Sequence, residues 1–215
     1  MHKPRRGLFL SFEGIDGCGK TTQAMLTYKF LTEQGFAASL LREPGSTEVA
    51  ERIRGILLDR KLEITNRTEL LLYEAARADL TERQIAPLLV RGQIVLCDRF
   101  YDSTTAYQGF GRRLDVTMVR GLHRVAVGNI RPDLTFVFDL DVRTAVTRRK
   151  GDPDRLEAQS QAFFERVRRG FLEIARKERR RVKVIDAAQP ADAVFEDVKK
   201  YLIRKLRGHE SRRSA

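Results

Sequence analysis

The sequence predicts one α/β domain of the doubly wound type, with a parallel sheet between two layers of helices. Short apolar runs alternate with longer stretches of helical periodicity. A glycine-rich phosphate-binding motif directly follows the first apolar run. The 215 residues contain no internal repeat and no low-complexity linker, and a chain of this length can bury the core of one domain. No second catalytic domain is therefore expected.

Five apolar runs have the length and composition of buried strands. They lie at residues 8–13, 36–41, 93–97, 134–140 and 182–186. Helical periodicity predicts helices at residues 21–34, 47–58, 66–90 and 191–206. Gly35 ends the first of these helices, Pro87 lies near the end of the third, and Pro190 introduces the last. This alternation of strand and helix favours parallel strands joined by crossover helices.

The chain is strongly basic, with a formal charge of +12. Part of this charge lies in two basic tails, residues 1–7 and 207–215, which flank the domain predicted at residues 8–206. The sequence has neither zinc-finger spacing nor aromatic residues interleaved with a basic run, so polynucleotide binding is not expected. A cleft for phosphate-rich small molecules is the alternative use of this charge.

Sequence patterns of membrane insertion, export and disulfide formation indicate the compartment in which a protein acts. No apolar run approaches the roughly 18 to 20 residues of a membrane-spanning helix. The N-terminal segment lacks the pattern of a signal peptide. Cys18 and Cys97 form no CxxC pair and no metal-ligand cluster, which fits a reducing compartment. We expect a soluble cytoplasmic protein that does not associate with a membrane.

The phosphate-binding motif occupies residues 14–21 and matches GxxxxGK[ST] between a predicted strand and a predicted helix. Its residues are Gly14, Ile15, Asp16, Gly17, Cys18, Gly19, Lys20 and Thr21. Backbone N–H groups of such a loop converge on phosphate oxygens, Lys20 reaches the β and γ phosphates, and the hydroxyl of Thr21 can bind Mg²⁺. The placement between strand and helix disfavours a merely structural turn.

Charged residues end two of the predicted strands. Asp98 and Arg99 follow the strand at residues 93–97, and Arg42 follows the strand at residues 36–41. The carboxyl edge of an open α/β sheet is where such folds bind ligands. Asp98 is therefore a candidate for organising Mg²⁺, and Arg99 and Arg42 are candidates for holding a second phosphate group. A strand-terminal salt bridge is the structural alternative.

A basic segment at residues 148–155 joins two helical stretches through glycine and proline. We expect a mobile lid at about residues 146–158, because phosphoryl transfer requires positive charge and the exclusion of water. Its basic residues are Arg148, Arg149, Lys150 and Arg155. The glycine turn of the phosphate-binding loop has no basic residue of its own, which makes a donor from the lid more necessary. A solvated basic loop is the alternative.

With these residues identified, the sequence resembles thymidylate kinase over about residues 8–203. Six segments carry the resemblance in the order of the family: FEGIDGCGKTTQ at residues 12–23, REPG at 42–45, LLYEAAR at 71–77, DRFYDSTTAYQG at 98–109, DRLE at 154–157 and DAAQP at 186–190. The sequence departs from the usual family pattern at Cys18, Ser46 and Tyr73, where alanine, glycine and phenylalanine are common. None of these departures removes a phosphate contact.

The resemblance implies roles for individual residues. Tyr73 would stack on thymine and Arg77 would hydrogen-bond its ring, with Thr104 and Gln108 completing the base pocket. Tyr107 would lie where a ribose 2′-hydroxyl would sit, and Asp16 would approach the 3′-hydroxyl. The acceptor phosphate would be held by Arg99 and Arg42, and the catalytic set would be Lys20, Asp16, Arg99, Arg148, Arg149 and Arg155. Thr22 and Gln189 would join the ATP site, with Gln189 in the loop beside adenine.

The resemblance also implies the fold and the reaction. The fold would be a three-layer P-loop NTPase domain with a five-stranded parallel sheet and a mobile lid. The reaction would move the γ-phosphoryl group of Mg-ATP to dTMP, giving dTDP and ADP for dTTP synthesis, in a cytoplasmic homodimer packed through helices. A nucleotide kinase for another base is one alternative. Another is a nucleic-acid-dependent ATPase or a switch GTPase, although the chain has no NKxD guanine motif.

Overall fold

A five-stranded parallel sheet with the order β2-β3-β1-β4-β5 forms the centre of the molecule. The computed structural model describes residues 6–149 and 151–210. The strands are β1 (Phe9–Glu13), β2 (Ala38–Arg42), β3 (Ile94–Asp98), β4 (Leu134–Asp139) and β5 (Val182–Asp186). The predicted fold class is confirmed. Lys150 of the predicted lid and most of both basic tails, residues 1–5 and 211–215, lie outside the described residues.

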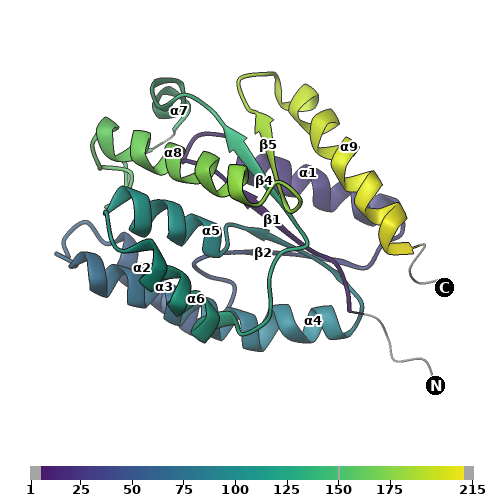
Figure 1. The fold of residues 1–215 in the computed structure, drawn as a ribbon, viewed down its shortest axis with the longest axis horizontal. Coiled ribbons are helices and arrows are strands. Elements are labelled where there is room, and N and C mark those ends of the chain that lie inside the picture. Colours follow the sequence, from purple (N-terminus) through teal and green to yellow (C-terminus); the bar gives the residue numbers. More distant parts are fainter. Residues whose placement is uncertain (1–5, 150, 211–215) are drawn as a thin grey trace.

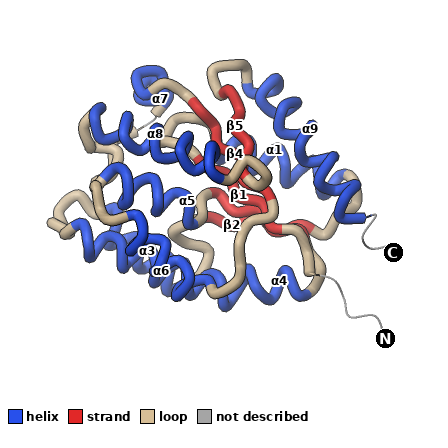
Figure 2. Tube along the Cα trace, viewed as in Figure 1, coloured by secondary structure: helices blue, strands red, loops and turns tan. Residues whose placement is uncertain are grey.

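Helices cover both faces of the sheet and complete a three-layer arrangement (Figures 1 and 2). They are α1 (Lys20–Glu33), α2 (Glu48–Leu58), α3 (Asn66–Leu80), α4 (Ala86–Val90), α5 (Tyr101–Thr104), α6 (Val116–Val127), α7 (Val142–Arg148), α8 (Gln161–Lys177) and α9 (Ala191–Glu210), with π-helical turns η1 (Thr81–Ile85) and η2 (Thr105–Gly111). In the part of the chain that the structure describes, no helix is long and apolar enough to cross a membrane.

The alternation of side chains along the strands builds the two halves of the core. Leu10 and Phe12 of β1 belong to the cluster that contains the buried residues of α1 and α9. Phe9 of β1 and Val95 and Cys97 of β3 point the other way and pack with Leu80 to Leu89 of α3, η1 and α4. Both faces of the sheet are therefore covered, as a parallel sheet requires.

Local signals explain where several helices begin. The side-chain oxygens of Thr47, Thr65, Asp115, Asp141 and Ser160 accept hydrogen bonds from backbone N–H groups in the first turns of α2, α3, α6, α7 and α8. Such N-caps satisfy donors that the helix itself leaves free. The last helix, α9, runs to Glu210, four residues beyond the predicted end at residue 206.

Two π-helical turns differ from the sequence-based expectation. The helix predicted at residues 66–90 is divided by η1, and no helix was expected over residues 101–111, where α5 continues directly into η2. The segment YDSTTAYQGFG contains β-branched residues and two glycines, which have low helix propensity, so tertiary packing must impose its helical form. π-helical turns are frequent at functional sites, and η2 carries Tyr107 and Gln108.

Candidate active site

The glycine-rich loop lies between β1 and α1 at the carboxyl edge of the sheet, and its backbone conformation requires glycine. Gly14 and Gly17 have φ values of 142° and 88°, and a Cβ at Gly17 would lie 2.1 Å from the backbone oxygen of Ala145. No L side chain fits that position. The loop is thus a tight cradle whose end leads into α1 at Lys20.

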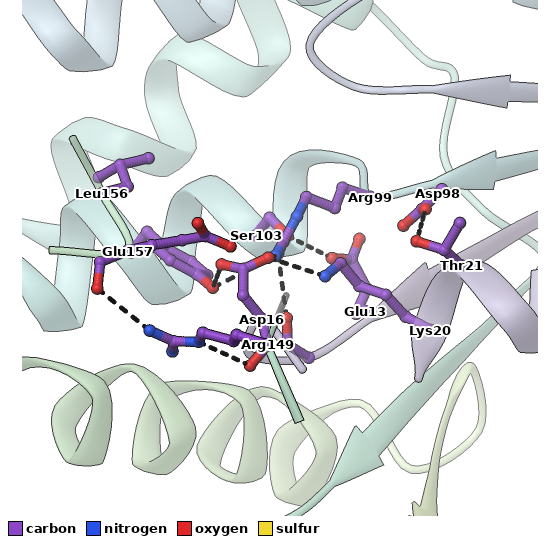
Figure 3. Close-up of polar contacts among 12 residues, drawn as sticks. Glu13, Asp16, Lys20, Thr21, Asp98, Arg99, Ser103, Arg149, Leu156 and Glu157 are labelled. Atoms are coloured by element: carbon purple, nitrogen blue, oxygen red, sulfur yellow. Dashed lines mark hydrogen bonds and ion pairs between the residues drawn. The ribbon is translucent and has the colours of Figure 1, made fainter. Parts of the chain in front are cut away.

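Asp16 is the centre of the polar cluster beside this loop (Figure 3). Its Oδ1 accepts hydrogen bonds from Lys20 Nζ at 3.0 Å and Arg99 Nη2 at 2.5 Å, and its Oδ2 accepts from the Tyr107 hydroxyl at 2.9 Å. Burial alone would raise the pKa of Asp16, but the charges of Arg99 and Lys20 together hold that pKa well below its ordinary value. The structure therefore brings three predicted site residues, Lys20, Arg99 and Tyr107, around the ionised carboxylate of a fourth, Asp16.

Arg99 is held in an uncommon backbone conformation. Its φ of 72° lies in the left-handed region, which costs a residue with a side chain on the order of 1–3 kcal/mol. Its Nη1 donates to the backbone oxygen of Gly14 and to Ser103 Oγ, each at 3.0 Å. Ser103 in turn donates to Glu13 Oε2 at 2.6 Å. These contacts fix the guanidinium beside the loop, as expected from its position at the end of β3.

Thr21 and Asp98 meet at the start of α1 and the end of β3. The hydroxyl of Thr21 donates to Asp98 Oδ2 at 2.5 Å (Figure 3). Asp98 Oδ1 is buried and has no hydrogen-bond partner among residues 6–149 and 151–210. Mg²⁺ in nucleotide sites commonly takes one or two protein oxygens and completes its shell with phosphates and water. A buried carboxylate oxygen without a partner, beside a hydroxyl, fits such an ion, although no cluster of three or more His, Cys, Asp or Glu exists among the described residues.

A cavity with an empty volume of about 540 Å³ opens next to Asp16 and Arg99. It is lined by Asp16, Glu43, Pro44, Arg54, Leu58, Tyr73, Arg77, Arg99, Ser103, Thr104, Tyr107, Gln108, Asp154 and Leu156. Seven of the eight residues predicted for the acceptor nucleotide are in this lining. The eighth, Arg42, is not. A concave site with aromatic side chains and a few converging polar groups is typical of small-molecule binding.

Arg54, which the sequence analysis did not identify, lines the cavity, whereas Arg42, which was predicted there, does not. Arg42 Nη2 lies 2.8 and 2.9 Å from the two carboxylate oxygens of Glu51 on α2, and its side chain is half exposed. Arg54, one turn further along α2, donates to the backbone oxygen of Pro44 at 3.0 Å and lines the cavity. The position of Arg42 at the end of a strand could not reveal that Glu51 of α2 pairs with it, or that Arg54 of α2 lines the cavity instead. The spacing of Glu51 and Arg54 along a helix was the only available signal.

Arg77 lies at the inner wall of the cavity between two carboxylates. Its Nε and Nη2 are 2.8 and 2.7 Å from Glu43 Oε2, and its Nη1 is 2.8 Å from Glu74 Oε1. The side chain is only 2% exposed. The predicted contact with a base edge is compatible with this position, because these contacts use three of its five N–H groups and the described part of the chain supplies no partner for the other two. Tyr73, one turn earlier on α3, lines the same cavity.

The three predicted lid cations occupy three different environments. Arg149 Nε donates to the backbone oxygen of Asp16 at 3.3 Å and Nη1 donates to that of Glu157 at 3.1 Å (Figure 3). Its guanidinium carbon is 4.2 Å from the centre of the Phe164 ring, and its buried Nη2 has no hydrogen-bond partner in the part of the chain that the structure describes. Of the three, Arg149 is the one that contacts the phosphate-binding loop.

Arg148 and Arg155 are directed elsewhere. Arg148 Nη1 donates to the backbone oxygen of Ala187 at 2.8 Å, in the loop that follows β5. Arg155 Nη1 forms an ion pair of 2.7 Å with Glu69, which is fully buried, and its Nε donates to the backbone oxygen of Leu57. Sequence reasoning could not separate these cations, because their orientation depends on residues distant in the chain.

A second hollow lies on the other side of the glycine-rich loop. It is lined by Cys18, Gly19, Thr22, Gln23, Arg148, Ala187, Gln189, Pro190, Ala191 and Val194. Gln189, predicted beside adenine, donates to the backbone oxygen of Asp186 and to Asp197, each at 3.2 Å. Burial raises the pKa of the Cys18 thiol, so this cysteine is a packing residue of the loop.

Comparison with known proteins gives a consistent result. The family model described as thymidylate kinase matches residues 12–198. Thymidylate kinase of Thermoanaerobacter sp. (strain X514) is 44% identical over 202 residues, which cover 92% of this chain and 100% of that protein. Thymidylate kinase of Desulforudis audaxviator is 47% identical over 188 residues, covering 86% and 85%. The crystal structure of thymidylate kinase from Ehrlichia chaffeensis superposes with a TM-score of 0.75 at 35% identity, covering 92% of this chain and 99% of that chain.

Proposed function

The chain belongs to the thymidylate kinase family, and from that premise we propose how its residues bind ATP and dTMP and move a phosphoryl group between them. The enzyme phosphorylates dTMP to dTDP at the expense of ATP. One observation carries the proposed geometry. Asp16 and Arg99 line the acceptor cavity and also contact Lys20 or the backbone of the glycine-rich loop, so the acceptor and donor phosphates meet at this pair.

The base of dTMP occupies the inner part of the cavity in this proposal. Tyr73 stacks on the thymine ring, and Thr104 and Gln108 complete the pocket. Arg77 uses an N–H group left free by its two carboxylate partners to donate to a ring carbonyl. Tyr107, which bonds to both Asp16 and Arg99, closes the side of the sugar and disfavours a 2′-hydroxyl.

The acceptor phosphate lies at the other end of the cavity, where Arg99 and Arg54 supply positive charge. Guanidinium groups bind phosphate oxygens with paired hydrogen bonds. Arg42 stays a prediction for this role, and its ion pair with Glu51 makes Arg54 the better placed of the two.

The donor nucleotide binds across the loop of residues 14–21, with adenine in the hollow beside Gln189 and Thr22. Lys20 and the backbone N–H groups hold its phosphates, and Arg149 adds the lid charge next to Asp16. Thr21 and Asp98 would hold Mg²⁺, which neutralises charge on the phosphates when bound. With acceptor and donor aligned, positioning and electrostatic stabilisation account for most of the rate enhancement.

Two features implied by the resemblance remain proposals. Leu71 of α3 and Met118 and Val125 of α6 are exposed apolar side chains on two helices that pack against each other. We infer that these helices form the interface of a homodimer, which light scattering of the purified protein would test. The second proposal is a cytoplasmic location.

A substrate panel tests the proposed function. The enzyme is incubated with Mg-ATP and one possible acceptor at a time, and ADP release is measured. The acceptors are dTMP, dUMP, dCMP, dGMP, ribothymidine 5′-monophosphate and single-stranded DNA. The proposal predicts rapid ADP release with dTMP and a much slower release with the ribonucleotide. Stimulation by DNA alone, or equal stimulation by every nucleotide, would contradict it.

A further inference from the structure

Behind the acceptor cavity, a chain of buried polar contacts connects three separate elements. Glu74 Oε1 of α3 accepts from Arg77 Nη1 at 2.8 Å and also contacts His123 Nδ1 of α6 at 2.9 Å. His123 Nε2 contacts Thr105 Oγ1 at 2.9 Å, and Thr105 is the first residue of η2. Each member of the chain is buried. The reaction described above uses Arg77 but assigns no role to Glu74, His123 or Thr105.

These three residues do not touch the nucleotide, because none of them is part of the cavity lining. They do connect its two walls. Arg77 and Tyr73 come from α3, whereas Tyr107 and Gln108 come from η2. His123 of α6 is therefore a bridge between the helix that carries the guanidinium and the π-helical turn that carries the amide.

The charge state of Glu74 determines which group donates in the hydrogen bond between Glu74 and His123. Burial alone would raise the pKa of Glu74, but Arg77 and the hydrogen bond from His123 lower it, so Glu74 is an ionised acceptor. A carboxylate can only accept, so His123 Nδ1 carries a proton and donates it. The imidazole stacks on the ring of Tyr101 with centroids 5.3 Å apart and an interplanar angle of 22°. Packing against Tyr101 sets the plane of the imidazole, and the contacts with Glu74 and Thr105 hold its two nitrogens in place.

Arg77 needs such a partner because its other carboxylate holds only one edge of the guanidinium. Glu43 contacts Nε and Nη2 through a single oxygen, Oε2. A second anchor on Nη1 is required to stop the guanidinium from turning about that oxygen. Glu74 is this anchor, and it lies on the same helix as Arg77, so it cannot by itself fix α3 relative to η2.

We propose that Glu74 and His123 are positioning residues for base recognition, which hold the guanidinium of Arg77 in register with Gln108 across the acceptor cavity. The inference rests on the proposed use of Arg77 to read thymine. His123, which lies outside the cavity, would thus contribute to base selectivity. The ligands between which it helps to discriminate are pyrimidine nucleoside monophosphates, which differ at the ring edge that Arg77 faces.

Three substitutions at His123 test the proposal. The amide nitrogen of asparagine takes the place of Nδ1 and can still donate to Glu74, whereas that of glutamine takes the place of Nε2 and reaches Thr105 instead. His123→Ala removes both contacts. Thr81→Val is a matched control, because Thr81 is a buried residue outside the cavity lining, and its hydroxyl has no hydrogen-bond partner among the described residues. For each purified variant, kcat and KM are measured with dTMP and dCMP, the Kd of dTMP is measured by calorimetry, and thermal unfolding is recorded.

The expected result is a split between binding and turnover. His123→Ala and His123→Gln should raise the KM and Kd of dTMP roughly tenfold and shrink the preference for dTMP over dCMP by a similar factor, as for the loss of about one charged hydrogen bond. The kcat at saturating dTMP should change little. His123→Asn should keep most of the affinity and the preference, and Thr81→Val should keep both.

Several results would overturn the proposal. One is a lower unfolding temperature in all His123 variants while the Kd of dTMP and the preference stay within about twofold of wild type. Equal losses in His123→Asn and His123→Gln would also overturn it, and this comparison remains decisive if His123→Ala does not fold. A wild-type enzyme that fails to phosphorylate dTMP would instead refute the proposed function, together with everything that rests on it.

Discussion

Arg149→Ala is the substitution that best separates the three cations of the lid. Arg149 is the only one of them that contacts the phosphate-binding loop, through the backbone oxygen of Asp16. No described residue accepts a hydrogen bond from its buried Nη2, so the guanidinium has a donor available for a phosphate oxygen. Arg155, by contrast, is engaged by Glu69, and Arg148 by the loop after β5.

The magnitude follows from the role of that donor. Removing one preorganised donor from the position where charge develops lowers kcat about 10²- to 10³-fold, which corresponds to about 3–4 kcal/mol. The effect on folding should be smaller. The variant loses the contact with Phe164, worth about 0.5–2 kcal/mol, and two hydrogen bonds to the backbone oxygens of Asp16 and Glu157, worth about 0.5–1.5 kcal/mol each. It also removes the buried Nη2, whose missing partner costs about 1–3 kcal/mol, and this gain opposes the losses.

Steady-state kinetics and thermal unfolding check this expectation. Arg149→Ala should lower kcat by the factor given above, with less than about a threefold change in the KM of dTMP, because the lid acts on the transition state. Arg155→Ala is the matched control, and we expect less than about a tenfold loss of kcat from it, since Arg112 still pairs with Glu69. A larger loss of kcat in Arg155→Ala than in Arg149→Ala would refute the assignment.

Three further predictions concern other parts of the site. Arg54→Ala should raise the KM of dTMP at least about tenfold, whereas Arg42→Ala should change it much less; the reverse order would restore Arg42 as the phosphate ligand. Asp98→Asn should raise the Mg²⁺ concentration needed for half-maximal activity roughly tenfold, and an unchanged Mg²⁺ titration would remove Asp98 from the metal site. Burial raises the pKa of Glu13 from 4.5 to about 8, so its stabilising contribution is complete below pH 4.5 and is lost as the pH rises towards 8. The free energy of unfolding in urea should therefore fall between pH 5 and 8, and it should fall less in Glu13→Gln. The lowered pKa values of Asp16, Glu69 and Glu74 affect stability only below about pH 4.5, so they do not contribute in this range. An equal decrease of the unfolding free energy with pH in wild type and variant would contradict this.

The sheet and the glycine-rich loop were predictable because their signals are local. Each strand is a short apolar run, and residues 14–21 carry their own geometry in the spacing of glycine, lysine and threonine. Asp98 and Arg99 were also predictable, since the end of a parallel strand specifies an edge of the sheet. The meeting of Thr21 with Asp98 follows from these two facts together.

The remainder of the site depends on contacts that single-sequence patterns do not encode. Arg42 ends a strand as predicted, but Glu51 on α2 draws its side chain away from the cavity. Glu69 and His123 look like ordinary helix residues in the sequence, and only tertiary packing makes Glu69 a partner of Arg155, and His123 a partner of Glu74 and Thr105. The π-helical turn η2 itself is imposed by tertiary packing against local propensity.

Direct observation of phosphoryl transfer tests the central claim. Wild-type enzyme, Mg-ATP and dTMP are followed by ³¹P nuclear magnetic resonance, which resolves the phosphates of ATP, ADP, dTMP and dTDP. We expect dTMP and ATP to disappear together while dTDP and ADP form in a one-to-one ratio, with almost no inorganic phosphate. Release of inorganic phosphate without dTDP, or transfer to dCMP at the same rate as to dTMP, would contradict it.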